Sequence, residues 1–460
     1  MNPRTEEEGI NVNLRTELRP FSSSAGEHVL VVDGSRIYDL DETTAAALTR
    51  ALDGQGDATE LNRIFALDST KRRIDGTPLA PPPLHAISLT VAQSCNMGCG
   101  YCYADEGRFG GARRMMCEET ARATVDRLLA EAAPGATVVV GFMGGEPLLN
   151  RRVVHATARY AVQAAAASGH AVRFTITTNG TVLKEEDVKL FSELPFTVAV
   201  SLDGDRAMHD ATRPLLGGGS SYDRLIAGMR LFERHGRPQH LAARVTVTPP
   251  LIDKLGDVLE HGIGLGFDEV GFAAVLSSPD PRLALGGEDF PRLLNAMVNC
   301  GETALAELKA GRSYPFGNFE TALGELHRGS HRPYPCGAAA GYLSASSDGG
   351  LFACHRFVDD PKFAMGDVRT GPDHGARALM LAERHVDRMD PCRQCWARYL
   401  CGGGCHHEVV SRGRPGCDYI RGWLQFCLRA YVELLDSRPE YFVNGRPEQL
   451  TPLSTATTFD

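Results

Sequence analysis

Three cysteines, at positions 95, 99 and 102, form a C-x3-C-x2-C pattern inside "SCNMGCGYCYADEG". Three thiolates can hold three irons of a [4Fe–4S] cube and leave the fourth iron open to a small molecule. Two alternatives are three buried structural cysteines, or a zinc site completed by a distant fourth ligand. The loop alone therefore does not decide among an iron–sulfur cluster, a zinc site and three structural cysteines.

The elements that must position this loop begin at residue 85, where β-branched and apolar runs alternate with helical patterns. Runs of this kind are typical of strands covered on both faces, and their alternation with helices predicts a parallel sheet. That sheet is either doubly wound or curved into a partial barrel, and in both cases chemistry lies at the C-terminal strand ends. The expected strands are 86–92, 137–143, 172–178, 196–202, 242–248 and 269–275. The cysteine loop directly follows the first of them, at the expected end.

Composition narrows the class of protein. A chain of 460 residues predicts two or three domains, and a net charge of −9 argues against a general nucleic-acid binder. The sequence has no apolar run long enough to span a membrane and no secretory signal at its polar start, so we expect a cytoplasmic protein without a membrane partner. Reducing cytosol disfavours disulfides, so the clustering of the 13 cysteines at short spacings predicts metal or iron–sulfur ligation.

With Tyr101 placed just before the third cysteine, the loop resembles the signature of the radical S-adenosylmethionine (radical SAM) enzymes. This resemblance implies a partial (β/α)6 TIM-type barrel as the core fold. It also implies that Cys95, Cys99 and Cys102 hold the catalytic [4Fe–4S] cluster. The methionyl amine and carboxylate of S-adenosylmethionine would chelate the open iron, and cleavage would give a 5′-deoxyadenosyl radical that abstracts hydrogen from the substrate.

Motifs at the ends of later strands extend the resemblance. "MGGEPLL" resembles the family's GGEP motif, in which two glycines permit close backbone approach and Glu146 offers a carboxylate to the methionyl ammonium. "TTNGT" and "SLDGDRAMHDATRP" offer polar contacts to the cofactor, and Arg244 could reach the methionyl carboxylate or form an ordinary salt bridge. The candidate cofactor-binding residues are Tyr101, Gly144, Gly145, Glu146, Asn179, Ser201 and Arg244.

The later cysteines fall into two patterns, C-x12-G-x4-C and C-x2-C-x5-C-x3-C. The second alone could be a zinc site. Together they resemble the SPASM extension, which implies two auxiliary [4Fe–4S] clusters and three clusters in total. Auxiliary site I would use Cys336, Cys354 and Cys405, and auxiliary site II would use Cys392, Cys395, Cys401 and Cys417. Cys427 is the alternative last ligand, but its place inside a predicted helix suits a packing residue. Cys117 and Cys300 are expected in the core.

Two departures from the family pattern bear on function. Some members have another cysteine shortly before the position of Cys336, whereas "HRGSHRPYPC" has none. Auxiliary site I would then keep an open iron, which sulfur-to-carbon-joining members are thought to use for the substrate thiolate. Sulfatase-maturing relatives have an aspartate base directly after the cysteine that matches Cys354, and His355 at that place argues against their activity. His355, His406 and His407 could carry protons, although neutral surface or supporting roles are expected.

The predicted division of the chain has five parts. Residues 1–80 form a small α+β unit with a mobile start, containing strands around an Asp33-Gly34 turn and a helix capped by Asp41 or Thr43. This unit resembles the peptide-recognition domain of peptide maturases, to which a leader peptide adds as a strand, or it is a simple decoration. The remaining parts are the barrel (81–285), a bridging helix (286–330), an irregular SPASM domain (331–435) and a tail (436–460).

The predicted function is that of a radical SAM/SPASM maturase that forms a thioether between a substrate cysteine and a carbon. The stretch 401–428 resembles maturases of the quinohemoprotein amine dehydrogenase small subunit, which make Cys-to-Asp/Glu thioethers. The expected partners are a peptide or small protein, with or without a leader, and an electron donor such as flavodoxin or ferredoxin. Alternatives are carbon–carbon crosslinking or, in other classes, a zinc-ribbon binding protein or an iron–sulfur redox sensor.

Overall fold

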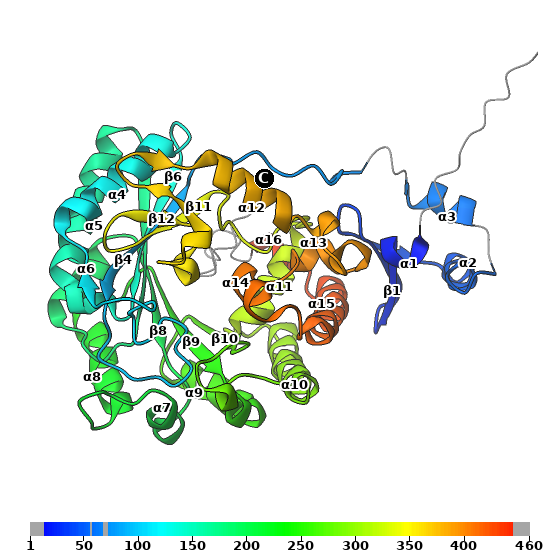
Figure 1. Cartoon of the computed structure of the whole chain (residues 1–460). Helices are drawn as coiled ribbons and strands as arrows, with labels where there is room; N and C mark the ends of the chain where they lie inside the picture. The colour runs from blue at the N-terminus through cyan, green and yellow to red at the C-terminus, as the bar shows by residue number, and fades with distance from the viewer. Residues whose placement is uncertain (1–12, 56–57, 68–71, 445–460) are drawn as a thin grey trace, which may run out of the picture.

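In the computed structural model, which describes residues 13–55, 58–67 and 72–444, the centre of the molecule is a curved parallel sheet (Figure 1). Its six central strands follow the order β10-β9-β8-β7-β6-β4. They are β4 (Ala86–Gln93), β6 (Thr137–Gly144), β7 (Ala171–Thr178), β8 (Phe196–Ser201), β9 (His240–Val247) and β10 (Glu269–Ala274). All six predicted strands are therefore present within two residues of their expected limits, and the partial barrel is confirmed.

Amphipathic helices cover the outer face of this sheet (Figure 1). In α5, for example, Val154, Ala158 and Ala161 recur at helical spacing and are buried. The outer elements are α4 (Glu118–Glu131), η2 (Pro147–Asn150), α5 (Arg151–Ala167), α6 (Glu185–Glu193), α7 (Arg206–Thr212), α8 (Ser221–His235), η3 (Pro249–Lys254), α9 (Leu255–Gly264) and η4 (Pro281–Leu283). The two-residue strand β5 (Arg114–Met115) pairs with β4.

The cysteine-rich segment continues the same sheet. β11 (Tyr342–Ala345) runs parallel to β4, and β12 (Gly350–Phe352), β13 (Ala364–Asp367) and β14 (Gly371–Pro372) follow as antiparallel neighbours. These strands lie within the segment 331–435 that was predicted to be irregular, and they were not predicted because they are too short to show a period. The other elements are η5 (His355–Phe357), η6 (Pro361–Phe363), α12 (His374–Arg384), η7 (Val386–Arg388), η8 (Cys392–Gln394), α13 (Arg398–Cys401) and α14 (His406–Arg412).

The N-terminal unit is a three-stranded antiparallel sheet with two helices on one face. Its elements are α1 (Leu14–Glu17), β1 (Leu18–Ser23), β2 (Gly26–Val31), β3 (Arg36–Leu40), α2 (Glu42–Leu52) and α3 (Ala58–Ile64). Asp41 caps α2 as predicted, accepting a hydrogen bond from the backbone N–H of Thr44 at 2.7 Å. β1 was not predicted, and Leu14 and Leu18 are buried, so the predicted mobile start of the unit does not include Leu14 and the residues after it. Residues 1–12 lie outside the described residues.

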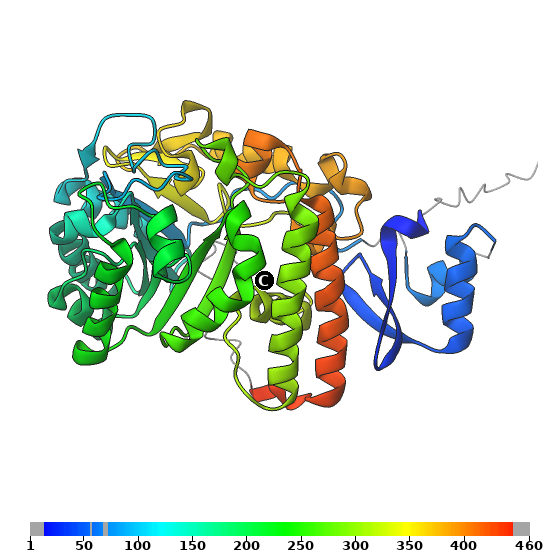
Figure 2. The same cartoon turned by 90° about the horizontal axis from the view of Figure 1, so that it is seen from below.

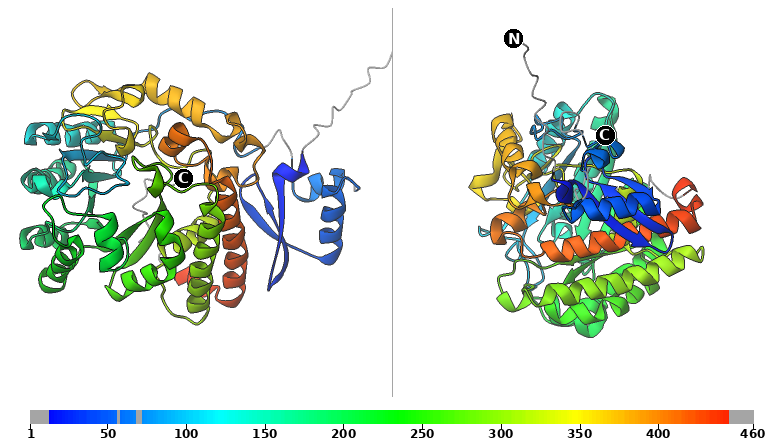
Figure 3. Two further views of the ribbon diagram at one scale, coloured as in Figure 1. Left: turned by 60° about the horizontal axis from the view of Figure 1, so that its bottom comes forward. Right: turned by 90° about the vertical axis from the view of Figure 1, so that its right-hand side faces the viewer.

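Two long helices stand between the barrel and the N-terminal unit. α10 (Asp289–Lys309) and α15 (Cys417–Ser437) lie side by side (Figure 2), and the β1–β2–β3 sheet lies against α15 (Figure 3). α11 (Gly317–His327) and α16 (Glu440–Asn444) complete this layer. Among the described residues, no helix combines the length and hydropathy needed to cross a bilayer.

A glycine permits the close approach of these two helices. A Cβ atom at Gly301 of α10 would lie 2.3 Å from Cε1 of Phe426 on α15, a distance that real Cβ atoms do not show. Because both residues are buried against the main core, neither helix can move aside without opening a gap.

Gly301→Ala should therefore lower the free energy of unfolding by about 1–3 kcal/mol, the usual cost of overpacking. The matched control is Gly256→Ala in α9, where an added Cβ would meet nothing within 4 Å. That variant should gain about 0.5–1 kcal/mol from helix propensity. Thermal unfolding of the metal-free protein measures both, and equal midpoints for the two variants would contradict the contact.

Candidate active site

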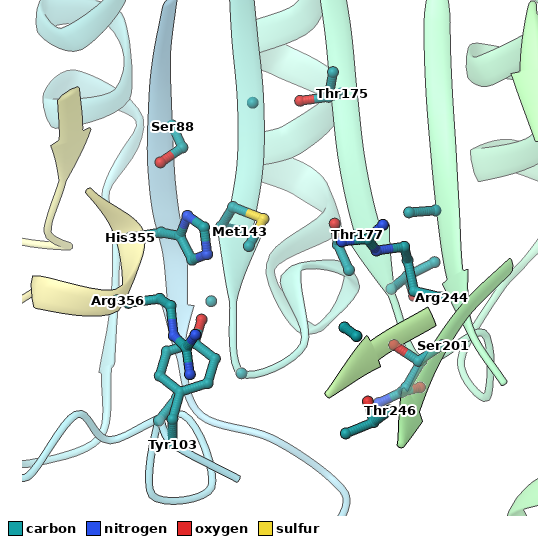
Figure 4. A pocket seen from close by; sticks show the side chains of 18 of the residues that line it. Ser88, Tyr103, Met143, Thr175, Thr177, Ser201, Arg244, Thr246, His355 and Arg356 are labelled. Atoms are coloured by element: carbon teal, nitrogen blue, oxygen red, sulfur yellow. The ribbon is translucent and has the colours of Figure 1, made fainter. Parts of the chain in front are cut away.

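A single cavity of about 740 Å³ runs through the barrel interior and joins two groups of cysteines. Cys95, Cys99 and Cys102 line it on the side of the β4 loop, and Cys336 and Cys405 line it on the side of the β11 segment. Figure 4 shows other side chains that line this cavity, with His355 and Arg356 on one side and Ser201 and Arg244 on the other. The structure thus brings together thiols that are more than 200 positions apart in the sequence.

The cavity exists because the side chains that face it are small or hydroxylated. In most closed barrels bulky branched side chains fill the interior, but here small side chains recur at every second position of the inner face. They are Ser88 of β4, Gly141 of β6, Thr175 and Thr177 of β7, Thr197, Ala199 and Ser201 of β8, and Thr246 of β9. The missing side-chain volume leaves room for a cofactor and part of a substrate.

The cysteine loop is held by main-chain hydrogen bonds to the segment that follows α7. The N–H of Gly98 donates to the carbonyl of Pro214 at 2.9 Å, and the N–H of Leu216 donates to the carbonyl of Asn96 at 3.1 Å. Burial raises the pKa of Cys95 to about 12, with the neighbouring thiols of Cys99 and Cys102 adding to the shift. Three thiols that influence one another in this way lie together, as the C-x3-C-x2-C spacing predicts.

Tyr101 joins a buried charge network that the sequence did not reveal. Its hydroxyl donates to the carboxylate of Asp203, which also accepts a hydrogen bond from Nε of Arg213 at 2.9 Å. The guanidinium of Arg213 lies 5.4 Å from the centre of the Tyr101 ring. Burial raises the pKa of Cys99, and the charge of Arg213 lowers it. Asp203 and Arg213 both belong to "SLDGDRAMHDATRP", the motif from which the sequence predicts only Ser201 as a cofactor-binding residue.

The GGEP segment meets the cysteine loop at van der Waals distance. A Cβ at Gly145 would lie 2.4 Å from the carbonyl oxygen of Ser94, so only glycine fits, and both Gly144 and Gly145 line the cavity. Glu146, in contrast, is fully buried and does not line it.

The carboxylate of Glu146 instead organises the end of β7. It accepts hydrogen bonds from the N–H of Leu148 at 3.0 Å, the hydroxyl of Thr178 at 2.8 Å and the N–H of Asn179 at 2.7 Å. Burial raises its pKa to about 7 even though these three bonds lower it. The geometry therefore gives Glu146 a supporting position behind the cavity wall, rather than direct access to a bound ammonium group.

The remaining candidate cofactor residues line the cavity wall. The side-chain amide of Asn179 donates to Oδ1 of Asn96 at 2.9 Å, which ties the β7 end to the cysteine loop. Ser201 and Arg244 are register partners on β8 and β9. Figure 4 shows both on the side of the cavity opposite His355. Burial lowers the pKa of Arg244 and Glu269 raises it, but within the described chain no carboxylate forms an ion pair with its guanidinium.

The thiols predicted for auxiliary site I also lie together. Burial raises the pKa of Cys354 to about 12, the backbone N–H of Arg356 lowers it, and the thiols of Cys336 and Cys405 raise it further. Nη1 of Arg356 approaches the sulfur of Cys405 at 4.0 Å and pairs with the carboxylate of Glu408 at 2.5 Å.

The other predicted thiols form auxiliary site II, and Cys417 and Cys427, the two candidates for its last ligand, differ in their surroundings. Burial raises the pKa of Cys417, Arg421 lowers it, and the thiols of Cys392 and Cys395 raise it further. The same two thiols contribute to the raised pKa of Cys401. Burial alone raises the pKa of Cys427, which is a member of the main apolar core.

The two isolated cysteines differ from each other. Cys300 is buried in the main core as predicted. Cys117, predicted to be a core residue, is exposed at the first turn of α4, where its thiol interacts with the hydroxyl of Thr120 at 3.2 Å. The pattern in the sequence failed there because a helix begins at the next residue and turns this side chain outward.

The polar groups around Cys405 fit a cluster-binding site. Several buried nitrogen atoms there have no hydrogen-bond partner among the described residues: Arg356 Nε, Arg384 Nη2, His406 Nε2 and His407 Nδ1. Buried polar atoms of native proteins are usually paired, so donors left over beside thiols suit a negatively charged sulfide group. In the described part of the chain, no three Cys, His, Asp or Glu side chains converge closely enough for a single metal ion.

The three histidines of this region are neutral, as predicted, but they are not surface residues. Burial lowers the pKa of both His355 and His406 to about 3, and that of His407 to about 4. Nδ1 of His355 lies 3.1 Å from the hydroxyl of Tyr342, and Nδ1 of His406 accepts a hydrogen bond from Arg384 at 2.9 Å.

Residues 89–260 match the model of the Radical SAM superfamily. The matched range contains the cysteine loop and the ends of β6, β7, β8 and β9 that line the cavity. This segment is a radical SAM domain, and the chain is an enzyme. The match implies a [4Fe–4S] cluster and S-adenosylmethionine, and it argues against a zinc-ribbon binding protein or a redox sensor as the main function.

Curated relatives of this radical SAM enzyme include anaerobic sulfatase-maturating enzymes. The serine-type enzyme of Klebsiella aerogenes is 24% identical over 378 residues, covering 78% of this chain and 89% of its own length. The cysteine-type enzyme of Clostridium perfringens strain 13 is 22% identical over 386 residues, covering 77% and 98%.

Two solved structures share the fold. The structure of anSMEcpe with bound AdoMet and the Cp18Cys peptide aligns with a TM-score of 0.65 at 19% identity, covering 77% of this chain and 99% of that one. Streptococcus suis SuiB bound to the precursor peptide SuiA aligns with a TM-score of 0.52 at 14% identity, covering 87% and 97%. At these identities the likeness establishes the fold alone.

In this radical SAM core the protein's own residues position and shield the chemistry. When bound, the cluster and S-adenosylmethionine supply the radical that removes a hydrogen atom from the substrate. The chain holds the cysteine loop rigidly through Gly98, Asn179 and the Tyr101 hydroxyl, and the glycines of the GGEP segment leave space for the cofactor.

Cys95→Ala should abolish formation of 5′-deoxyadenosine, because the catalytic cluster loses one of its three thiolates. Cys117→Ala is the matched control, since Cys117 is exposed and lies outside the cavity. Chromatography of reactions with S-adenosylmethionine and dithionite measures the product. Cleavage by the Cys95 variant at the wild-type rate would overturn the assignment of the catalytic loop.

Proposed function

We propose that this radical SAM enzyme is a maturase that joins the sulfur of a substrate cysteine to a carbon of the same peptide or small protein. The observation that carries the proposal is the single cavity shared by the catalytic loop and the thiols of Cys336 and Cys405. A substrate side chain inside that cavity can reach both groups at once.

The cofactor contacts belong to the same proposal. We assign the catalytic cluster to Cys95, Cys99 and Cys102, and the S-adenosylmethionine site to the wall formed by Tyr101, Gly144, Gly145, Asn179, Ser201 and Arg244, with Glu146 supporting the wall from behind. We assign auxiliary cluster I to Cys336, Cys354 and Cys405, and auxiliary cluster II to Cys392, Cys395, Cys401 and Cys417.

Auxiliary site I has three thiols where a cube has four irons. The seven residues before Cys336 include no cysteine, and the histidine at 355 stands where the sulfatase-maturing pattern has an aspartate. A substrate thiolate can complete such a site as its fourth ligand. This supports sulfur–carbon bond formation over the oxidation of a single serine or cysteine.

The bond change is a two-hydrogen oxidation of the substrate. An S–H bond and a C–H bond are lost and one S–C bond forms. The hydrogen atom from carbon leaves in 5′-deoxyadenosine, the thiol proton leaves to solvent, and one electron returns to the iron–sulfur sites. One molecule of S-adenosylmethionine is consumed for each crosslink, with methionine as the other product.

The charge of the cavity supports a substrate that carries carboxylates. Within the described chain, the residues that line it include four arginines and no aspartate or glutamate, although the whole chain has a net charge of −9. The four are Arg173, Arg213, Arg244 and Arg356. Guanidinium groups in a cavity wall attract acidic groups, as a Cys-to-Asp or Cys-to-Glu thioether would require.

The test is the reaction of the reconstituted enzyme with a Cys-containing precursor peptide encoded beside this gene. The expected product has lost two hydrogens, has no free thiol and survives reductant. A matched peptide with Asp and Glu replaced by Asn and Gln should react at least about tenfold more slowly if the arginines select carboxylates. A product that loses two hydrogens but keeps its thiol would favour carbon–carbon crosslinking and overturn the thioether proposal.

We propose further that the N-terminal unit receives the leader of the substrate on β3. Among the described strands, β3 pairs only with β2, so one edge of the sheet is open. Tyr38 and Asp39 on this edge are exposed, whereas the sheet contacts α15 from its other side. An extended peptide can add to such an edge as another strand. The alignment with SuiB, whose structure contains a precursor peptide, supports this proposal.

Adding the N-terminal half of the same precursor to the enzyme should slow hydrogen exchange at residues 36–40, because their outward N–H groups become hydrogen-bonded. The C-terminal, Cys-containing half serves as the control and should leave these amides unchanged. Mass spectrometry of peptic fragments measures the effect. Equal exchange with and without the leader half would contradict docking on β3.

A further inference from the structure

The N-terminal unit reaches the auxiliary site II loop through one buried ion pair. Arg398 lies in α13, between Cys395 and Cys401, and its Nη2 donates to both carboxylate oxygens of Glu17 at 2.7 and 2.8 Å. Nη1 of the same guanidinium donates to the carbonyl of Thr16 at 2.8 Å. An arginine within the ligand loop is therefore neutralised by a carboxylate 381 positions earlier in the chain.

Both partners of this pair are removed from water. Arg398 is 2% exposed and Glu17 is 5% exposed. Arg72 donates to Oε1 of Glu17 at 2.6 Å from the edge, and Asp387 lies 3.6 Å from Nε of Arg398. Removing one member of a buried pair is far more harmful than removing both, because it leaves an uncompensated charge in a medium that solvates it poorly.

An apolar contact accompanies the ion pair. Val32, at the end of β2, is buried in a small cluster that belongs otherwise to the loop. Its buried members are Val32, Val386, Met389, Cys392 and Tyr399. One of the thiols assigned to auxiliary site II thus packs against the N-terminal unit. The two short helices of the loop, η8 and α13, span only three and four residues and cannot hold their shape alone.

We propose that the N-terminal unit is a structural part of auxiliary site II, so that docking of this unit through Glu17 and ordering of the Cys392–Cys401 loop are one equilibrium. The identity of the loop as a cluster site rests on the function proposed above; the coupling itself rests on the Glu17–Arg398 pair and on Val32. Coupling is reciprocal, so a ligand bound to the N-terminal sheet changes the loop, and a group bound in the loop stabilises the sheet.

The first experiment needs no iron. Hydrogen exchange of the metal-free full-length protein is compared among wild type, Glu17→Gln and Glu27→Gln. Glu27 is the matched control, because it is an exposed glutamate on β2 that accepts a hydrogen bond only within its own unit, from Ser22. In Glu17→Gln, exchange at residues 386–401 should rise by about tenfold or more, whereas Glu27→Gln should match wild type.

The second experiment uses the reconstituted protein. If site II fails in Glu17→Gln, the variant should lose about a third of its iron, one cube of three, and should still form 5′-deoxyadenosine in the absence of substrate. The double variant Glu17→Gln with Arg398→Gln should retain more iron than either single variant, because it removes both charges. In the wild type, loading with iron should slow exchange at residues 14–32.

Unchanged exchange at residues 386–401 in Glu17→Gln, or additive effects in the double variant, would overturn the proposal. Should Glu17→Gln not fold, an unaltered exchange of residues 14–32 between metal-free and loaded wild type would overturn it as well. A wild-type protein that binds only the iron of the catalytic cluster would refute the assignment of site II under the proposed function. The metal-free exchange would then still decide whether the two segments are coupled.

Discussion

The parallel hydrogen bonding of β11 to β4 is the interaction on which the geometry of the cavity depends. β4 leads directly into the catalytic cysteine loop, and β11 lies between Cys336 and Cys354 in the sequence. Tyr342 pairs with Ala86 and Ala345 pairs with Leu89, so main-chain bonds of one sheet carry both groups of thiols. The backbone positions of β4 and β11 are thus fixed by the sheet, and the size of the side chains between them decides how much space remains.

Positive and negative side chains lie at different distances from the cavity. The guanidinium groups of Arg213 and Arg356 line the interior, while their counterions, Asp203 and Glu408, do not. A buried arginine without a carboxylate would be costly, but a counterion in the cavity would cancel the field that a substrate meets. Placing the carboxylates behind the wall stabilises the fold and leaves the guanidinium groups facing the cavity, which Arg244 also lines.

What the sequence could predict depended on how far apart the interacting residues are. Buried strands show a nearly continuous apolar run, and the three thiols of the β4 loop stand within a few positions of one another, so local patterns in the sequence indicate both. The four-residue strand β11 has no period to detect, and the exposure of Cys117 depends on where α4 begins. Glu17 and Arg398 are separated by nearly the whole chain, and no local pattern links a glutamate near one end to an arginine near the other.

The shared strand β4 also fixes a distance within the molecule. Because β4 leads into the loop of Cys95 and β11 is hydrogen-bonded to β4, the starting points of the two groups of thiols cannot slide past each other without breaking ladder hydrogen bonds. A hinge or clamshell movement between them is therefore excluded while the sheet is intact. For the proposed thioether, the length of the gap between the two groups of thiols would set how far apart the sulfur and the attacked carbon can lie.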